Sequence, residues 1–114
     1  MDDLELKELG GFIGTQSYYA VLGANVTDGV KYIMDNGYSW FVTDTLAVVK
    51  GLARLKAQPF LAVKLKRTAN KEADVTIEDG NDNILHSQHY GYTDAKKDVT
   101  LYFVDNVLML SNEY

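Results

Sequence analysis

The spacing of hydrophobic residues changes at Pro59, from a helical period before it to the alternation of β-strands after it. Upstream of this proline, a stripe of mainly apolar positions recurs every three or four residues, which predicts a helix over 39–55. Gln58 and Pro59 end that helix. The stripe consists of Phe41, Thr45, Val48, Leu52 and Leu55.

Two shorter helices are predicted upstream of this one. The first runs over 16–22 from an N-cap at Thr15. The second begins at Thr27, carries an apolar i, i+3, i+4 stripe, and ends at the Asn-Gly pair 36–37. Residues 2–9 are expected to add a helical turn before a pair of glycines.

Strands are predicted downstream of Pro59, where the period becomes two. Apolar and polar residues alternate over 60–67 and 73–78, which indicates two half-buried strands joined by a polar loop. Turn signals at 79–82 and 105–106 separate the remaining strands from one another. Those strands are expected over 83–90, 99–103 and 107–110.

The order of these elements predicts an α+β fold in one domain, 1–114, with a helical half (1–57) followed by a sheet half (58–114). Three N-terminal helices would pack on one face of a four- to five-stranded antiparallel meander sheet. In such a meander the last strand, which contains Leu108 and Leu110, lies near an edge.

Charge is distributed unevenly along the chain. The stretch 50–71 carries +7 and no acidic residue, and because the whole chain carries −5, the remaining residues carry −12. A basic stretch of this kind is either a docking patch or a set of locally paired cations. Lys64 and Lys66 favour the second interpretation, because they would face Asp74 and Glu78 across a hairpin. The acidic remainder makes binding to double-stranded nucleic acid an unfavourable hypothesis.

The residue types needed for catalysis or metal binding are scarce. The chain has no cysteine, and its two histidines, His86 and His89, would point to opposite faces of a strand. The acidic stretch 79–83 lacks the frame of a calcium loop and is better explained as a turn. The glycine-rich stretch 10–15 is neither a phosphate-binding loop nor a dinucleotide fingerprint. We therefore expect no catalytic residue, no metal and no cofactor.

Aromatic and charged side chains supply the candidate binding residues. Asp44 follows Trp40 by four positions, so both project from one side of the predicted helix. Asp44 is expected to accept a hydrogen bond from a tyrosine hydroxyl or from the Trp40 indole. Tyrosines are common at recognition surfaces. The candidate ligand- or partner-binding residues are Tyr18, Tyr19, Trp40, Asp44, Lys64, Lys66, Arg67, Tyr92 and Asp94.

Short motifs that occur in a fixed order suggest a family. They include FIGTQ at 12–16, TDGVKY at 27–32, YTD at 92–94 and SNEY at 111–114. Together they resemble a family of small uncharacterised proteins, a domain of unknown function, found in bacteria and on phages and plasmids. This resemblance implies a cytosolic setting, with the gene on a mobile element as one option, and it supplies no established catalytic residue.

Three hypotheses for function follow. The first is a small, non-enzymatic module that binds a protein partner, with an inhibitor of a host defence complex (an anti-CRISPR-type acidic mimic of nucleic acid or a surface blocker) as a specific case. The second is an enzyme or small-ligand binder with a pocket between helices and sheet, lined by Thr27, Asp28, Trp40, Asp44 and 92–94. The third is a homodimer formed through the strand of Leu108 and Leu110.

The sequence also bears on location. No stretch approaches the roughly 18 apolar residues of a membrane span, and the acidic N-terminal stretch has neither the basic nor the apolar part of a signal peptide. We therefore expect a cytoplasmic protein that does not bind membranes.

Overall fold

The computed structural model describes residues 18–93, 95 and 97–113, without the side chains of 53 and 54. In this part of the chain one seven-stranded sheet has the order β1-β2-β7-β6-β3-β4-β5. β2 and β7 run parallel, and the other neighbouring pairs are antiparallel. The strands are β1 (Tyr18–Val21), β2 (Ala24–Thr27), β3 (Leu61–Ala69), β4 (Glu72–Glu78), β5 (Ile84–Tyr90), β6 (Val99–Val104) and β7 (Val107–Leu110).

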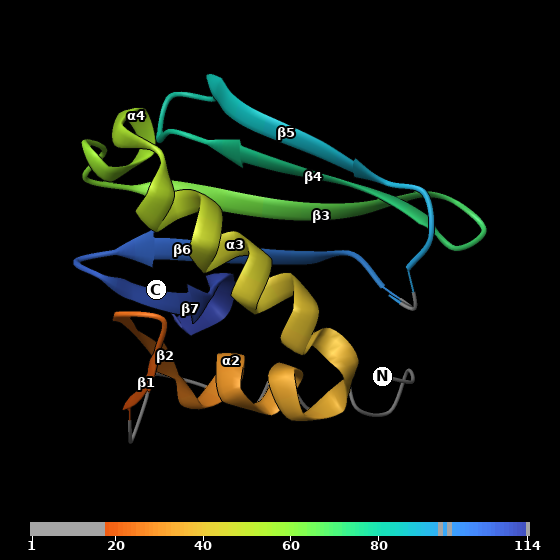
Figure 1. The fold of residues 1–114 in the computed structure, drawn as a ribbon, viewed down its shortest axis with the longest axis horizontal. Coiled ribbons are helices and arrows are strands. Elements are labelled where there is room, and N and C mark those ends of the chain that lie inside the picture. The colour runs from red at the N-terminus through yellow and green to blue at the C-terminus, as the bar shows by residue number, and fades with distance from the viewer. Residues whose placement is uncertain (1–17, 94, 96, 114) are drawn as a thin grey trace.

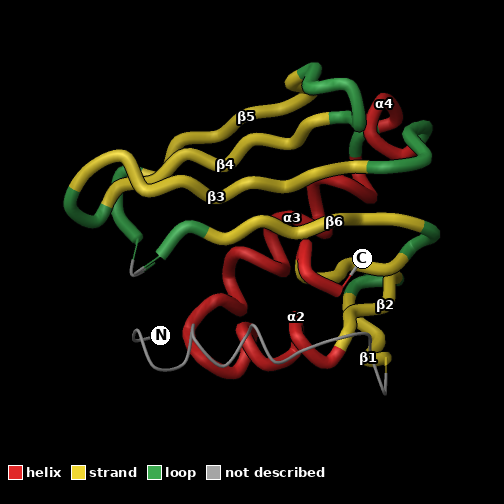
Figure 2. The backbone as a smooth tube through the Cα atoms, turned by 180° about the vertical axis from the view of Figure 1, so that it is seen from behind, coloured by secondary structure: helices red, strands yellow, loops and turns green. Residues whose placement is uncertain are grey.

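One kinked helical segment crosses a single face of this sheet (Figures 1 and 2). It consists of α2 (Asp28–Ile33), the kinked turn η1 (Met34–Tyr38) and α3 (Ser39–Gly51). The kink falls at Gly37, whose φ of 101° lies in the left-handed region that favours glycine. A short α4 (Ala53–Lys56) follows α3, and η2 (Ser111–Glu113) follows β7.

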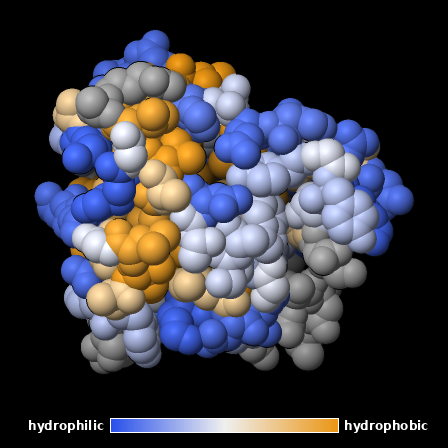
Figure 3. All heavy atoms as spheres, viewed as in Figure 1, coloured by the Kyte–Doolittle hydropathy of each residue, from blue (hydrophilic) through white to orange (hydrophobic). Residues whose placement is uncertain are grey.

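The core lies between this helical segment and the sheet. Leu61, Val63 and Leu65 of β3 are buried on the helix side, whereas Lys64 and Lys66, which point the other way, are exposed, as the alternating pattern predicts. From the helical segment, the core receives Val30, Ile33, Tyr38, Phe41, Val42, Leu46 and Val49. On the surface of that face, hydrophobic residues gather on one side, and much of the rest is hydrophilic (Figure 3).

Two of the predicted helices are present in the structure, but the predicted three-helix arrangement is not. The prediction over 39–55 is confirmed as α3 and α4, apart from a break at Leu52, whose backbone is extended. The helix that begins at Thr27 is confirmed too, and the Thr27 hydroxyl caps it by accepting a hydrogen bond from the backbone N–H of Val30 at 3.3 Å. The three-helix prediction is wrong, because one helical segment, 28–51, covers the sheet.

The helix predicted over 16–22 is wrong in its described part. That part is β1, and the expected connector after it is β2. Leu22 (φ 50°) and Gly23 (φ 80°) form a left-handed two-residue turn, which reverses the chain into a hairpin. The predicted helical turn over 2–9 and the N-cap at Thr15 lie outside the described residues.

The predicted meander of four or five antiparallel strands is also wrong. β3, β4 and β5 do pair in sequence, but β6 returns to the free side of β3 and does not pair with β5. β7 consequently lies between β6 and β2, so Leu108 and Leu110 are buried inside the sheet. The expected edge at these leucines, and the homodimer drawn from it, therefore lose their basis.

The C-terminal turn η2 is tied to the start of α2 and to the end of β7. The Glu113 carboxylate accepts hydrogen bonds from the Thr27 hydroxyl at 2.6 Å and from the backbone N–H groups of Leu110 and Gly29 at 2.9 and 3.3 Å. A negative charge at the N-terminus of α2 is also favoured by the helix dipole. A Cβ at Gly29 would lie 2.5 Å from a Leu110 methyl carbon and 2.7 Å from a Glu113 oxygen, so a larger residue here would displace these side chains.

We expect Glu113→Ala to lower the free energy of unfolding by about 1–3 kcal/mol, because it leaves partly buried donors without their acceptor. Urea unfolding measures the change. Ser111→Ala, at an exposed position of the same turn, is the control and should change stability little. Equal stabilities of the two variants would show that the carboxylate does not hold the junction.

Candidate functional site

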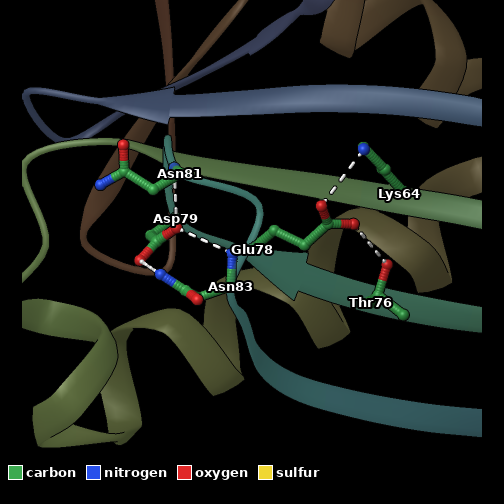
Figure 4. Close-up of polar contacts among 6 residues, drawn as sticks. All are labelled: Lys64, Thr76, Glu78, Asp79, Asn81 and Asn83. Atoms are coloured by element: carbon green, nitrogen blue, oxygen red, sulfur yellow. Dashed lines mark hydrogen bonds and ion pairs between the residues drawn. The ribbon is translucent and has the colours of Figure 1, made fainter.

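The charged residues of the described sheet lie on two interior strands. Every Asp, Glu, Lys and Arg of the described strands belongs to β3 or β4. Lys64 Nζ lies 3.2 Å from Glu78 Oε1, and the other oxygen of Glu78 accepts a hydrogen bond from Thr76 (Figure 4). Lys66 lies opposite Asp74 in the register. The expected cross-strand pairing of the basic stretch is thus confirmed for Lys64, whereas for Lys66 the structure shows only that it lies opposite Asp74.

The two outermost described strands carry no Asp, Glu, Lys or Arg. β1 reads YYAV and β5 reads ILHSQHY. Natural sheets commonly protect their edges with lysine, proline or very short strands. β5 has seven residues and no described strand on its outer side. Its one irregularity is a register shift near Ile84, so 86–90 form a regular, mostly exposed run.

An aromatic cluster lies on the helix side of the end of β5. The Tyr90 hydroxyl donates a hydrogen bond to Asp44 at 3.1 Å, and the Tyr90 and Trp40 rings meet edge to face with centroids 5.1 Å apart. Partial burial, with the Asp44 charge adding to it, raises the pKa of Tyr90 to about 12. The hydrogen bond expected for Asp44 is present, and its donor is Tyr90.

A second polar cluster lies on the opposite face of β5. His89 stands directly across from Asp74, and its Nδ1 lies 2.6 Å from an Asp74 oxygen. Its Nε2 lies 3.2 Å from Glu72. The hydrogen bond to Asp74 raises the pKa of His89 above the usual 6.5; desolvation opposes this shift, and Glu72 adds to it. Each ring nitrogen already faces a different carboxylate, and the described residues contain no cluster able to hold a metal ion.

The remaining candidate residues lie at separate places. Tyr92 is 70% exposed, and the Lys71 ammonium lies 5.1 Å from the centre of its ring. Tyr18 and Tyr19 are exposed on β1, at the opposite edge from β5. Asp94 lies outside the described residues. Lys64, Lys66 and Arg67 lie on interior strand β3, where Arg67 donates its backbone N–H to Asp98 at 2.8 Å.

The described residues proposed as a ligand pocket make separate structural contacts. Thr27 serves as a helix cap and binds Glu113, whereas Trp40 and Asp44 contact Tyr90. The acidic stretch 79–83 is a turn, as expected. Asp79 accepts hydrogen bonds at 2.8–3.0 Å from the Asn81 and Asn83 backbones and from the Asn83 side chain (Figure 4), and the Asn83 contact chiefly lowers its pKa.

Sequence reasoning missed the roles of Glu72, His89 and Tyr90. Their grouping depends on the register of β4 against β5, which the sequence pattern alone leaves open. One signal was present, because an acidic i, i+2 pair at 72 and 74 points to one face of a strand.

The fold and these clusters define a small helix-on-sheet domain whose outer strand β5 has no Asp, Glu, Lys or Arg. The chain belongs to a family of unknown function, DUF6876, which matches residues 3–114. The resemblance to an uncharacterised family is thereby confirmed. A search of curated proteins and a search of solved structures each found no match. In the described residues, no helix is long and apolar enough to cross a membrane.

We expect His89 to titrate above pH 6.5, and Asp74→Asn to lower its pKa, because that substitution removes the main charge favouring the imidazolium. Because the pKa of His89 is higher in the folded state than in the unfolded state, its contacts with the carboxylates stabilise the fold fully below pH 6.5. This stabilisation is lost as the pH rises through the folded-state pKa. The pKa of His89 is measured from the NMR shifts of the histidine ring protons as a function of pH. Asp79→Asn, in the turn before β5, is the control. A His89 pKa that is the same in both variants would contradict the proposed contact.

Proposed function

We propose that this protein is a non-enzymatic interaction module that binds an extended segment of a partner protein along the outer edge of β5. The observation that carries the proposal is the placement of charge. Every Asp, Glu, Lys and Arg of the described sheet lies on β3 or β4, and the seven-residue strand β5 has none of these four residue types. An unprotected edge of this length is a template for an added strand.

The geometry of an antiparallel strand supports this proposal. Alternate residues of β5 direct their N–H and C=O groups toward β4, and those between them direct these groups outward. An added strand would use the outward groups over 86–90, the regular part of β5. Main-chain hydrogen bonds would then supply affinity whatever the partner's sequence.

The flanking clusters would supply specificity. On the helix side, a partner side chain beside Tyr90 would meet the Tyr90–Trp40 aromatic pair and the Asp44 carboxylate. Aromatic side chains of this kind are over-represented at binding hot spots. On the other face, a partner side chain beside His89 would meet the polar group formed with Asp74 and Glu72.

An acidic mimic of nucleic acid, the specific case raised from the sequence, has less support. Among the acidic residues of β4, Glu78 is paired with Lys64, and Asp74 lies opposite Lys66. The face that carries these strands is therefore mixed in sign, whereas a mimic of a phosphate backbone requires unpaired negative charge.

A display library of random decapeptides tests the proposal without a known partner. Gln88 is exposed in the middle of β5, so Gln88→Lys places a charge on the edge while leaving the core unchanged. We expect selected peptides to bind the unmodified protein and to lose at least about tenfold in affinity for Gln88→Lys, equivalent to roughly 1.4 kcal/mol.

Asn81→Lys is the matched control, because it adds the same charge at an exposed turn that is not part of the strand. It should bind selected peptides as the unmodified protein does, and both variants should keep the same circular dichroism spectrum and melting temperature. Peptides that bind Gln88→Lys undiminished, or a library that yields no binder, would overturn the proposal.

A further inference from the structure

A surface pocket of about 280 Å³ lies away from β5, where the C-terminal end of α3, the chain after α4 and the tip of the β6–β7 hairpin meet. These elements lie together at the left of Figure 1, the side on which hydrophobic residues gather in Figure 3. The apolar residues that line the pocket are Val49, Leu55, Pro59 and Phe103.

One wall of the pocket is held by a hydrogen-bonded joint between two hairpin tips. Lys50 donates to the Asn106 side-chain oxygen at 2.8 Å and to the Gly23 carbonyl at 3.3 Å. The Asn106 side chain donates to the same carbonyl at 3.0 Å. The polar atoms of Lys50 and Asn106 are therefore committed to the fold, and the ligand chemistry must come from the other polar residues.

Those other residues are Lys56, Gln58 and Asp105. Lys56 and Asp105 both line the pocket, and within the described chain neither forms an ion pair with the other or with any other side chain. Asp105 has a backbone φ of +53° and forms a left-handed turn with Asn106.

We propose that this pocket binds a free α-amino acid with an aliphatic or aromatic side chain. The ligand carboxylate pairs with Lys56 and accepts a hydrogen bond from the Gln58 amide, and the ligand ammonium pairs with Asp105. The ligand side chain lies on the apolar lining formed by residues such as Leu55 and Phe103. This binding is independent of the β5 edge.

The presence of both charges is what selects a zwitterion. A simple anion would be attracted by Lys56 but repelled by Asp105. A simple cation would be attracted by Asp105 but repelled by Lys56. A molecule that carries both charges close together satisfies each group, and an apolar side chain removes the lining from water.

The test is an NMR titration of the full chain with L-leucine and with two analogues that each lack one charge. These are 4-methylpentanoate, which lacks the ammonium group, and 3-methylbutylamine, which lacks the carboxylate. We expect leucine to shift the amide signals of the pocket residues saturably, and each analogue to bind at least about tenfold more weakly.

Two conservative variants test which residue contacts each charged group of the ligand. Asp105→Asn, which suits a left-handed backbone, should remove the preference for leucine over 4-methylpentanoate. Lys56→Gln should remove the preference over 3-methylbutylamine. Gln88→Lys on β5 is the control and should bind leucine as the unmodified protein does. Equal binding of the three compounds, or no saturable shift at the pocket with leucine, would overturn the proposal.

Discussion

The parallel pairing of β2 with β7 is the constraint on which the rest of the structure depends. These strands are joined at Asn25–Val107 and Val26–Leu108, so nearly the whole described chain lies between them in sequence. The helical segment and the other hairpins must therefore fit within a single crossover. Two groups of hydrogen bonds hold the β2 region against the β7 region. One is formed by the Glu113 carboxylate, and the other by Lys50 and Asn106 with the Gly23 carbonyl.

The parts of the fold that the sequence predicts are those set by local periodicity. The helix 39–55, the cap at Thr27, the turn at Asp79 and the alternation in β3 each depend on neighbours a few residues away. The order of the strands depends on contacts between distant segments, and the sequence pattern does not encode it. The hairpin β1–β2 was missed because its tyrosines also fit a short helix, and the parallel partner that stabilises it is β7.

The candidate site shows the same division. That Asp44 would accept a hydrogen bond from a tyrosine followed from its place on a helix, but which tyrosine depended on where β5 ends relative to α3. Likewise, His86 and His89 were expected on opposite faces, yet the pairing of His89 with Asp74 required the β4–β5 register. The ion pair of Lys64 with Glu78 could be expected from the predicted hairpin, because it needed only β4 as a partner.

The central claim is that the outer edge of β5 is open to an added strand, and residue-by-residue hydrogen exchange tests it most directly. In the free protein, we predict that amides of alternate residues over 86–90, bonded to β4, exchange slowly, and that those between them exchange rapidly. A bound decapeptide from the display selection should slow the rapid set. Protection of every β5 amide in the free protein, or a rapid set that the peptide leaves unchanged, would contradict the account.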